Sequence, residues 1–340
     1  MSKKANLGQF YTTKYEHILQ GMVIPEGVRR IVEPFAGNGD LLNFVDKNKY
    51  EVASYDIDPK QEWITQRDTL LKPPCYDDSF VLTNPPYLAR NKNADKAMYD
   101  LYKCNDLYKC FLVQLVDTSC TGGIIIIPLN FMCSVRKSDI ALRQRFFTRF
   151  AVGLINVFEE KVFDDTAYSV CSLQFASRTA DSPQAMQAHI HPSNKKMHLT
   201  LNKGNGFTIG GEIYRLPQSE YAVSRATKLT DVGSISNILL KCIDDNAAST
   251  IKLRVVSDPD RFIDNTAKLS ARSYATLVFT PAIDAERQLR LVGQFNKFLD
   301  SHRREYNSMF LTNYRESNSI ARKRISFNLA FQICSHLLLA

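Results

Sequence analysis

The sequence predicts an α/β fold in which a largely parallel sheet is linked by crossover helices. Short runs rich in Val, Ile, Phe and Tyr alternate with helical patterns along the first half of the chain, which is typical of βαβ units. The first of these runs leads into a glycine turn at residues 36–39 and then into a helix start. At roughly 150 residues per domain, a length of 340 residues also predicts about two domains.

The individual elements follow from the same residue patterns, taken in chain order. Seven strands are expected, at residues 29–35, 51–57, 63–66, 80–83, 124–127, 152–158 and 168–175. Helical spacing is found at Leu41, Leu42, Phe44 and Val45 after the glycine turn, and at Leu107, Phe111, Leu115 and Val116 after the fourth strand. In the second half, Leu289, Leu291, Val292, Phe295 and Phe298 predict a scaffold helix.

The charge of the chain is distributed unevenly. It carries 43 Lys and Arg against 35 Asp and Glu, a formal net charge of +8, which suggests a polyanionic partner. A polar stretch with two prolines, 179–194, follows the last expected strand and is interpreted as a linker between domains 1–178 and 179–340. The first domain holds 22 basic and 21 acidic side chains and the second 21 and 14, so nearly all of the excess lies in the second.

Several protein classes are excluded by what the sequence lacks. The eight cysteines include no CxxC pair and the N-terminus has no apolar signal core, so a reduced, cytoplasmic protein is expected. No apolar stretch approaches the ~20 residues of a membrane span, and no membrane anchor is expected. His189 and His191 lie close together without a cysteine partner, so they predict a surface loop and no metal site.

Chemically informative residues fall at the expected strand ends, where ligands bind in open parallel sheets. Gly37 and Gly39 let the backbone approach a ligand and offer amide donors, although a tight turn alone would also need them. Asp56 ends the second strand, where a carboxylate can accept hydrogen bonds from ribose hydroxyls; a solvated carboxylate is the alternative. Asp68 could accept from an adenine amino group or cap a helix.

The glycine turn also indicates what kind of ligand fits. The dinucleotide fingerprint G-x-G-x-x-G is incomplete, because Leu42 stands at its third glycine position. A pyrophosphate cofactor is therefore disfavoured, and an adenosine ligand without phosphates fits better.

The strongest chemical signal is Asn84-Pro85-Pro86-Tyr87, directly after the fourth strand. The prolines fix the backbone and remove two amide donors, which leaves carbonyl groups free to face a substrate. The Asn84 side-chain oxygen and the Pro85 carbonyl are acceptors and the Tyr87 ring is a stacking surface, a set that suits a planar group bearing an NH2. Acceptors that hold the hydrogens of such an amine favour a tetrahedral nitrogen whose lone pair can attack a methyl group in line.

With these motifs the sequence resembles the gamma class of S-adenosylmethionine-dependent DNA adenine-N6 methyltransferases of restriction-modification systems. The resemblance covers about residues 7–178, through GQFYTT (8–13), EPFAGNG (33–39), YDIDP (55–59), RD (67–68), TNPPY (83–87) and VFDDTAYSVCSLQF (162–175). It implies a Rossmann-like, seven-stranded mixed sheet with an antiparallel last strand, followed by a smaller α+β target-recognition domain. It also implies that the target base is flipped out of duplex DNA, since a stacked base cannot reach the pocket.

The resemblance further implies roles for individual residues. Thr12 or Thr13 would lie near the methionine part of the cofactor S-adenosylmethionine, Glu33, Phe35 and Gly37 would line its site, Asp56 would hold the ribose and Asp68 the adenine. Asn84, next to the cofactor, Pro85 and Tyr87 would hold the target base, and Phe175 matches the position of an aromatic residue that contacts this base; a core phenylalanine is the alternative.

The second domain has no catalytic motif and is expected to read DNA. Its basic clusters would supply salt-dependent phosphate contacts. They are Lys195, Lys196, Arg215, Arg303, Arg304, Arg322, Lys323 and Arg324. The expected partner is duplex DNA, bound by a monomer, with a cognate restriction endonuclease that acts separately; for each cluster alone, a solvated basic face is the alternative.

Other functions remain open on the sequence alone. Cytosine-N4 methylation uses a similar grip on an exocyclic amine, although Asn rather than Ser before the prolines favours adenine. RNA or a protein glutamine are further substrates for the same chemistry. A DNA-binding specificity protein with a decayed catalytic half is the non-enzyme alternative, and the intact Gly37, Asp56, Asp68 and Asn84 speak against it.

Overall fold

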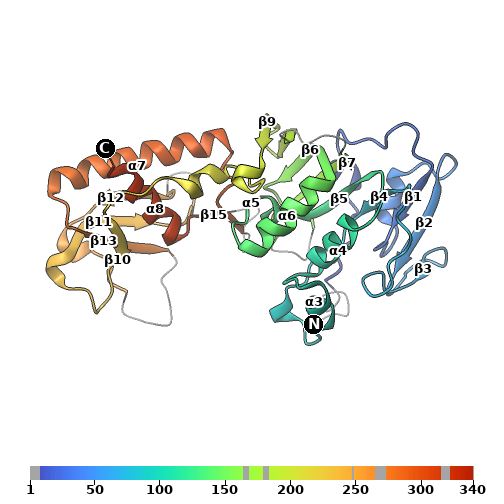
Figure 1. Cartoon of the computed structure of the whole chain (residues 1–340), viewed down its shortest axis with the longest axis horizontal. Coiled ribbons are helices and arrows are strands. Elements are labelled where there is room, and N and C mark those ends of the chain that lie inside the picture. The colour runs from blue at the N-terminus through green and yellow to red at the C-terminus, as the bar shows by residue number, and fades with distance from the viewer. Residues whose placement is uncertain are drawn as a thin grey trace. The chain divides into compact units, whose positions relative to one another are not determined.

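The computed structural model describes residues 8–163, 168–178, 184–246, 249–264, 273–314 and 322–339. The chain divides into two compact units (Figure 1). Unit 1 comprises Met1–Phe207 with Ser317–Ile320, and unit 2 comprises Thr208–Glu316 with Ala321–Ala340. The division therefore falls after Phe207, whereas the sequence pattern placed it after Arg178.

Unit 1 is built on a mixed sheet of nine strands in the order β3-β2-β1-β4-β5-β7-β6-β8-β9. The strands are β1 Arg30–Glu33, β2 Glu51–Asp56, β3 Thr65–Gln66, β4 Phe80–Thr83, β5 Gly122–Pro128, β6 Phe150–Phe158, β7 Val170–Ser177, β8 Gln184–His191 and β9 Lys195–Leu201. Strands β1 to β5 pair in parallel, and β7 runs antiparallel between β5 and β6. The prediction of an α/β fold with a mixed sheet is thereby confirmed, and each of the seven predicted strands has a counterpart in β1 to β7.

The sheet has two strands more than the resemblance implies, because the described part of the stretch interpreted as a linker, residues 184–194, is folded. β8 pairs in parallel with β6, and β9 pairs antiparallel with β8. Met186, Ala188 and Ile190 form the buried face of β8. The predicted surface loop at His189 and His191 is therefore wrong. Polar residues at alternate positions and a small Ala on the buried face hide this strand in the sequence.

The helices of unit 1 are short. They are α2 Tyr15–Ile18, η1 Asp40–Phe44, η2 Arg90–Lys92, α3 Ala97–Tyr102, α4 Leu107–Val116, α5 Asn130–Cys133, α6 Lys137–Arg149 and η3 Lys203–Asn205. The predicted helix after the glycine turn is only a 3-10 helix, η1. The predicted helix after β4 is α4, which is buried on nearly all sides.

Unit 2 is an α+β structure with an antiparallel sheet in the order β10-β13-β11-β12. Its elements are η4 Gly211–Arg215, β10 Ala222–Arg225, η5 Val232–Ser234, β11 Ile235–Lys241, β12 Lys252–Val255, η6 Asp258–Asp260, β13 Tyr274–Thr280, α7 Ala285–Glu305, β14 Thr312–Tyr314, β15 Arg322–Arg324 and α8 Phe327–Leu337. The helix predicted around residues 289–298 is confirmed as α7, although Leu289 is exposed on it.

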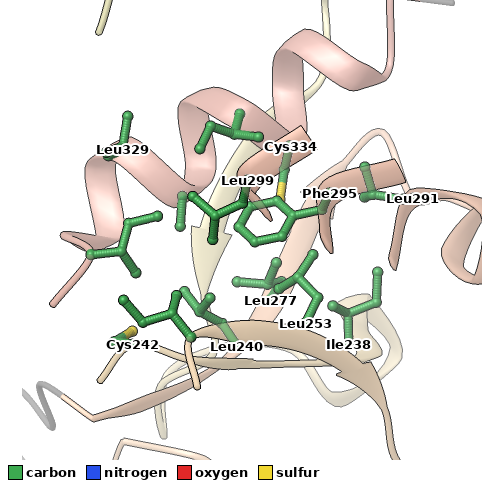
Figure 2. Close-up of a cluster of buried hydrophobic side chains, with 14 of the residues drawn as sticks. Ile238, Leu240, Cys242, Leu253, Leu277, Leu291, Phe295, Leu299, Leu329 and Cys334 are labelled. Carbon is green, nitrogen blue, oxygen red and sulfur yellow. The ribbon is translucent and has the colours of Figure 1, made fainter. Parts of the chain in front are cut away.

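The core of unit 2 lies between the two helices and one face of the sheet (Figure 2). Leu291, Phe295 and Leu299 of α7 are four residues apart, so they form one stripe on the helix. They pack on Leu240 and Leu277 of the sheet and are fully buried. This burial gives unit 2 an apolar core of its own.

The edge of the unit 2 sheet at β12 is closed by a side chain. The Leu253 backbone N–H donates to Oδ1 of Asn296 at 2.9 Å, and Nδ2 of Asn296 donates to the Leu253 carbonyl at 3.0 Å. Asn296 lies on α7 and makes the pair of bonds that a neighbouring strand would make. The helix therefore contributes both apolar packing and edge protection to the sheet.

The net charge is shared more evenly between the folded units than between the predicted domains. Unit 1 holds 25 basic and 22 acidic side chains, a net +3, and unit 2 holds 18 and 13, a net +5. The difference arises because Lys195, Lys196 and Lys203, together with Asp181, belong to unit 1. Among the described residues, no helix has the length and apolar character needed to span a membrane.

Candidate active site

A cavity of about 300 Å³ opens in unit 1 at the carboxyl ends of β1, β2 and β4. Its volume is at the lower end of the range for ligand sites. Seven of the predicted site residues line it: Thr12, Glu33, Phe35, Gly37, Asp56, Asp68 and Asn84. The sequence separates these residues by as many as 72 positions, and the parallel sheet brings them to one edge.

Four predicted residues do not line the cavity. Thr13 is exposed beside it, and Pro85 and Tyr87 are buried behind it. Phe175 is 2% exposed within the core, where its ring packs on Phe150 with centroids 4.9 Å apart. In this structure Phe175 therefore packs as a core residue of β7.

Fifteen further residues line the cavity that were not predicted as site residues from the sequence. They are Gln9, Phe10, Tyr11, Ala36, Asp40, Leu41, Ile57, Arg67, Thr69, Leu70, Pro86, Asn93, Asp95, Met98 and Leu107. Gln9, Phe10 and Tyr11 belong to the GQFYTT motif, which could have indicated them. Asn93, Asp95 and Met98 follow the NPPY motif in a stretch that carries no signal of its own.

The glycine turn is held by Asp56, which is 3% exposed. Oδ2 of Asp56 accepts a hydrogen bond from the Gly37 backbone N–H at 2.7 Å, and Oδ1 accepts from the Asp58 backbone N–H at 2.8 Å. Nε2 of Gln9 also donates to Oδ1, at 3.0 Å. Because a carboxylate has about four lone-pair sites, Asp56 keeps limited capacity for a ligand hydroxyl while it shapes the turn.

The second glycine of the turn is required by its backbone and by its neighbour. Gly39 has a φ of +84°, and a Cβ there would collide with the Trp63 ring. Trp63 is the only tryptophan of the chain. Its indole therefore lies directly against the wall of the cavity.

Glu33 at the end of β1 is a buried acid, 1% exposed, that faces the cavity. Within the described part of the chain, its Oε2 has no hydrogen-bond partner. Burial and then the nearby Asp56 carboxylate raise the pKa of Glu33 well above its usual range, while Thr83 and the Asn84 backbone act in the opposite direction. A positively charged ligand would relieve this cost.

The cavity as a whole is acidic. The carboxylates of Glu33, Asp40, Asp56, Asp68 and Asp95 line it, together with a single guanidinium, that of Arg67. Arg67 already donates to the carbonyls of Lys72 at 2.7 Å and Pro73 at 2.8 Å. Such a lining repels phosphates and favours a cationic ligand, which agrees with the incomplete dinucleotide fingerprint.

Asn84, in the cavity wall, forms a buried pair with Tyr87, which lies behind it. The Tyr87 hydroxyl lies 2.5 Å from Oδ1 of Asn84 and 2.7 Å from the Ile126 carbonyl. Burial raises the pKa of Tyr87 well above its usual range, so the hydroxyl keeps its proton and donates it. The Phe10 ring stacks on the Tyr87 ring with centroids 5.3 Å apart. Within the described residues, the Pro85 carbonyl accepts no hydrogen bond.

Asp106 fixes the chain that leaves the NPPY motif. Its Oδ1 accepts a hydrogen bond from the Leu88 backbone N–H at 3.1 Å, and the Leu107 N–H donates to the Leu88 carbonyl at 3.2 Å. Burial raises the pKa of Asp106 to about 6, against the effect of the Lys109 ammonium. Asp106 thus ties the NPPY loop to the N-terminus of α4.

The residues predicted to bind DNA are not gathered into one cluster. Lys195 and Lys196 are exposed on β9 of unit 1, whereas Arg215, Arg303, Arg304, Arg322, Lys323 and Arg324 belong to unit 2. Arg303 forms a bidentate ion pair with Asp244, at 3.1 and 2.6 Å. Lys323 is buried and donates to Oδ1 of Asn313. Arg303 and Lys323 therefore stabilise unit 2 itself.

Comparisons with known proteins give only distant similarities, all of them to solved structures. None of the protein-family models and none of the curated proteins matches the sequence. Among solved structures, one similar chain is proposed to be the modification subunit of a type I restriction enzyme from Vibrio vulnificus YJ016, with 15% identity over 58% of this chain and 50% of that one and a TM-score of 0.42.

Two further solved structures show the same level of similarity. The type I restriction-modification methyltransferase subunit from Streptococcus thermophilus has 14% identity over 54% of this chain and 47% of its own, with a TM-score of 0.38. A proposed class I S-adenosylmethionine-dependent methyltransferase from Listeria monocytogenes has 16% identity over 57% and 70%, with a TM-score of 0.40. The chain thus spans about half the length of the two type I subunits. At these identities and TM-scores, the similarity assigns no function.

Proposed function

We propose that this protein is a DNA methyltransferase that transfers a methyl group from S-adenosylmethionine to the exocyclic N6 of an adenine flipped out of duplex DNA. In this proposal it acts as the modification enzyme of a restriction-modification system, and unit 2 reads the target sequence. The observation that carries the proposal is the placement of Asn84 on the wall of an acidic cavity that also contains the glycine turn and Asp56.

The cavity residues fit the cofactor. S-adenosylmethionine carries positive charge on its sulfonium and ammonium groups, has no phosphate, and supplies an activated methyl group. Glu33, with its unpartnered oxygen, suits the ammonium group. Asp56 would accept from the ribose and Asp68 from the adenine amino group. Asp68 already uses Oδ1 to accept the backbone N–H groups of Leu70 and Leu71, both at 3.1 Å, which holds the carboxylate in place.

The NPPY loop would hold the target amine. Oδ1 of Asn84 and the Pro85 carbonyl would accept the two amine hydrogens, which favours a tetrahedral nitrogen with its lone pair directed at the methyl group. The N–CH3 bond forms as the sulfonium S–CH3 bond breaks, with the thioether S-adenosylhomocysteine as the leaving group. No base has to remove a proton before this step, because the attacking nitrogen is neutral; the methylated nitrogen is then cationic and releases one of its two hydrogens as a proton to solvent. The main contribution of the protein is therefore orientation and the exclusion of water.

The experiment that tests the proposal is methyl transfer from S-adenosylmethionine to duplex DNA, followed by base-resolved mapping of the modified positions. We expect N6-methyladenine at a defined sequence, and loss of transfer in Asn84→Ala with cofactor and DNA affinity within about one order of magnitude of the wild type. Asn48→Ala, at an exposed position of the same unit, is the control.

Three other outcomes would change the proposed base, the proposed substrate or the role of the NPPY loop. Methylation of cytosine would keep the mechanism and replace the base. Methyl transfer to RNA or to a glutamine side chain with none to DNA would contradict the proposed substrate. Transfer by Asn84→Ala at the wild-type rate would remove the NPPY loop from the reaction.

A further inference from the structure

The segment Gly8–Thr12, the strap, runs between the glycine turn and the NPPY loop and contacts both. The Tyr87 backbone N–H donates to the Gly8 carbonyl at 2.9 Å, and the Phe10 ring stacks on Tyr87. Gln9 donates to Asp56, and the Tyr11 ring lies against Gly37. Successive side chains of an extended chain point to opposite sides. The odd-numbered residues of the strap therefore contact the cofactor end of the site and the even-numbered residues its NPPY end.

The strap determines how the amide of Asn84 is oriented. Nδ2 of Asn84 donates to the Phe10 carbonyl at 2.8 Å and lies 3.1 Å from Oγ1 of Thr12. A carbonyl oxygen can only accept, so the nitrogen of the amide must face the strap. The oxygen then faces the Tyr87 hydroxyl, whose single proton is shared between this oxygen and the Ile126 carbonyl. Both amide hydrogens are used by the strap, and Oδ1 keeps one lone pair for a substrate.

We propose that Thr12 is a positioning residue for methyl transfer, because it holds the Asn84 amide with its oxygen toward the target amine. This inference rests on the proposed function and deepens it. Thr12 is 4% exposed and Asn84 is 8% exposed, so water cannot easily replace the lost acceptor. Without the Thr12 hydroxyl, one amide hydrogen lacks a buried partner, and only the Phe10 carbonyl still holds the amide nitrogen, so the Asn84 oxygen is held less rigidly.

The same contacts explain why residue 84 is Asn. An Asp at this position has no N–H to donate, and its oxygen would face the Phe10 carbonyl and the Thr12 hydroxyl. The NPPY sequence and the strap are thus complementary in hydrogen-bonding terms.

Thr12→Val and Thr12→Ser test the proposal in the full chain. The valine is nearly isosteric but accepts no hydrogen bond, whereas the serine keeps the hydroxyl. In single-turnover methyl transfer we expect Thr12→Val to lower the rate constant by ~10- to 100-fold, with the cofactor Kd unchanged within about threefold. Thr12→Ser should restore most of the rate. Thr200→Val, at an exposed position on β9, is the matched control.

A second measurement does not depend on activity. In protein labelled with ¹⁵N at asparagine, the side-chain amide signal of Asn84 is assigned by its disappearance in Asn84→Asp. We expect this signal to shift in Thr12→Val and to stay in place in Thr12→Ser and Thr200→Val.

These results separate the two proposals. An unchanged Asn84 signal in Thr12→Val overturns the positioning role, whether or not the protein methylates DNA. A loss of cofactor affinity as large as the loss of rate also overturns it, because Thr12 would then act on the cofactor. If wild-type protein methylates no DNA but the Asn84 signal shifts in Thr12→Val, the proposed function fails and the Thr12–Asn84 contact is supported.

Discussion

At the residue scale, the carboxylate of Asp56 has two roles. It shapes the glycine turn, and it faces the cavity. Asp56→Ala removes the acceptor for the Gly37 and Asp58 backbone N–H groups as well as the proposed ribose contact. We expect the affinity for S-adenosylmethionine to fall by at least ~10-fold, because a charge-assisted hydrogen bond contributes about 1.5–3 kcal/mol. Calorimetry and the fluorescence of Trp63 would measure it.

The indole of Trp63 is a useful reporter because it is the only one in the chain and touches Gly39. Asp46→Ala is the control for Asp56→Ala, since Asp46 is an exposed acid that caps a turn through the Asn48 backbone N–H. Equal cofactor affinity in Asp56→Ala and wild type would place the ligand elsewhere.

Asp106 gives a prediction for the pH dependence of stability. Burial raises its pKa from 3.8 to about 6, so the folded chain holds this proton more tightly than the unfolded chain. The free energy of unfolding contributed by this group is therefore highest below about pH 4 and falls as the pH rises through about 6. The fall amounts to about 3 kcal/mol, because each pKa unit between the folded and the unfolded chain corresponds to about 1.36 kcal/mol.

Asp106→Asn removes the titration while keeping an oxygen that can accept from the Leu88 N–H. Urea unfolding at several pH values should show the fall in wild-type protein to be larger than in the variant. Glu33 also has a raised pKa and contributes in both proteins, so the difference between the two curves isolates Asp106. Parallel curves would show that Asp106 is not the group that titrates.

Where chemistry restricts the residue type, the residues predicted from the sequence lie around one cavity, and their roles in binding and catalysis stay predictions. Glycine at 37, carboxylates at 33, 56 and 68 and the amide at 84 all line the cavity. Asn93 and Asp95 could not be foreseen, because they reach the cavity only through the path of the chain between η2 and α3. Tyr87 was foreseen as a stacking surface, but its hydroxyl bond to Asn84 depends on packing.

At the scale of elements, apolar β-rich runs gave reliable strands. β4 and β5 are buried along their whole length, so their sequences are uninterrupted apolar runs. β8 lies near the edge of the sheet and needs only one apolar face, so its sequence mixes Gln, Ala and His with Met and Ile. Strands with one exposed face, like β8, carry a weaker signal for this physical reason.

The cap of β12 by α7 can be tested by a single substitution. Asn296→Ala leaves the Leu253 N–H and carbonyl without their side-chain partner. We expect a loss of about 1–3 kcal/mol in the free energy of unfolding, as for a buried polar group left unpaired. Urea unfolding would measure it, with Gln294→Ala on the exposed side of α7 as the control. Equal stability of both variants would show that water replaces Asn296 at this edge.

At the scale of the whole molecule, charge is shared by the two units. The predicted domains carry net charges of +1 and +7, whereas the folded units carry net charges of +3 and +5. Sequence composition could not reveal this, because the lysines around β9 join the first sheet only through strand pairing. We therefore propose that both units contribute to the electrostatic attraction of DNA.

The salt dependence of DNA binding tests whether both units contribute to the attraction of DNA. The logarithm of the affinity should fall linearly with the logarithm of the salt concentration, with a slope of about −0.9 per phosphate neutralised. Replacing Lys195 and Lys196 with Ala should weaken binding and reduce that slope by up to about 2. Lys252→Ala, at an exposed position of unit 2, is the variant with which the β9 variant is compared. An unchanged slope in the β9 variant would remove β9 from the DNA interface.

The pairing of β8 with β6 also decides how the protein can be dissected. A chain cut at residue 178 would lose β8 and β9. The backbone of β6 from Leu154 to Phe158 would then be unpaired on the side that β8 occupies, although β7 would still pair on the other side. An unpaired strand of this kind recruits strands from other molecules and promotes aggregation. A shortened protein meant to carry the cavity alone should therefore extend to Phe207, and insolubility of a shorter version would say nothing about its chemistry.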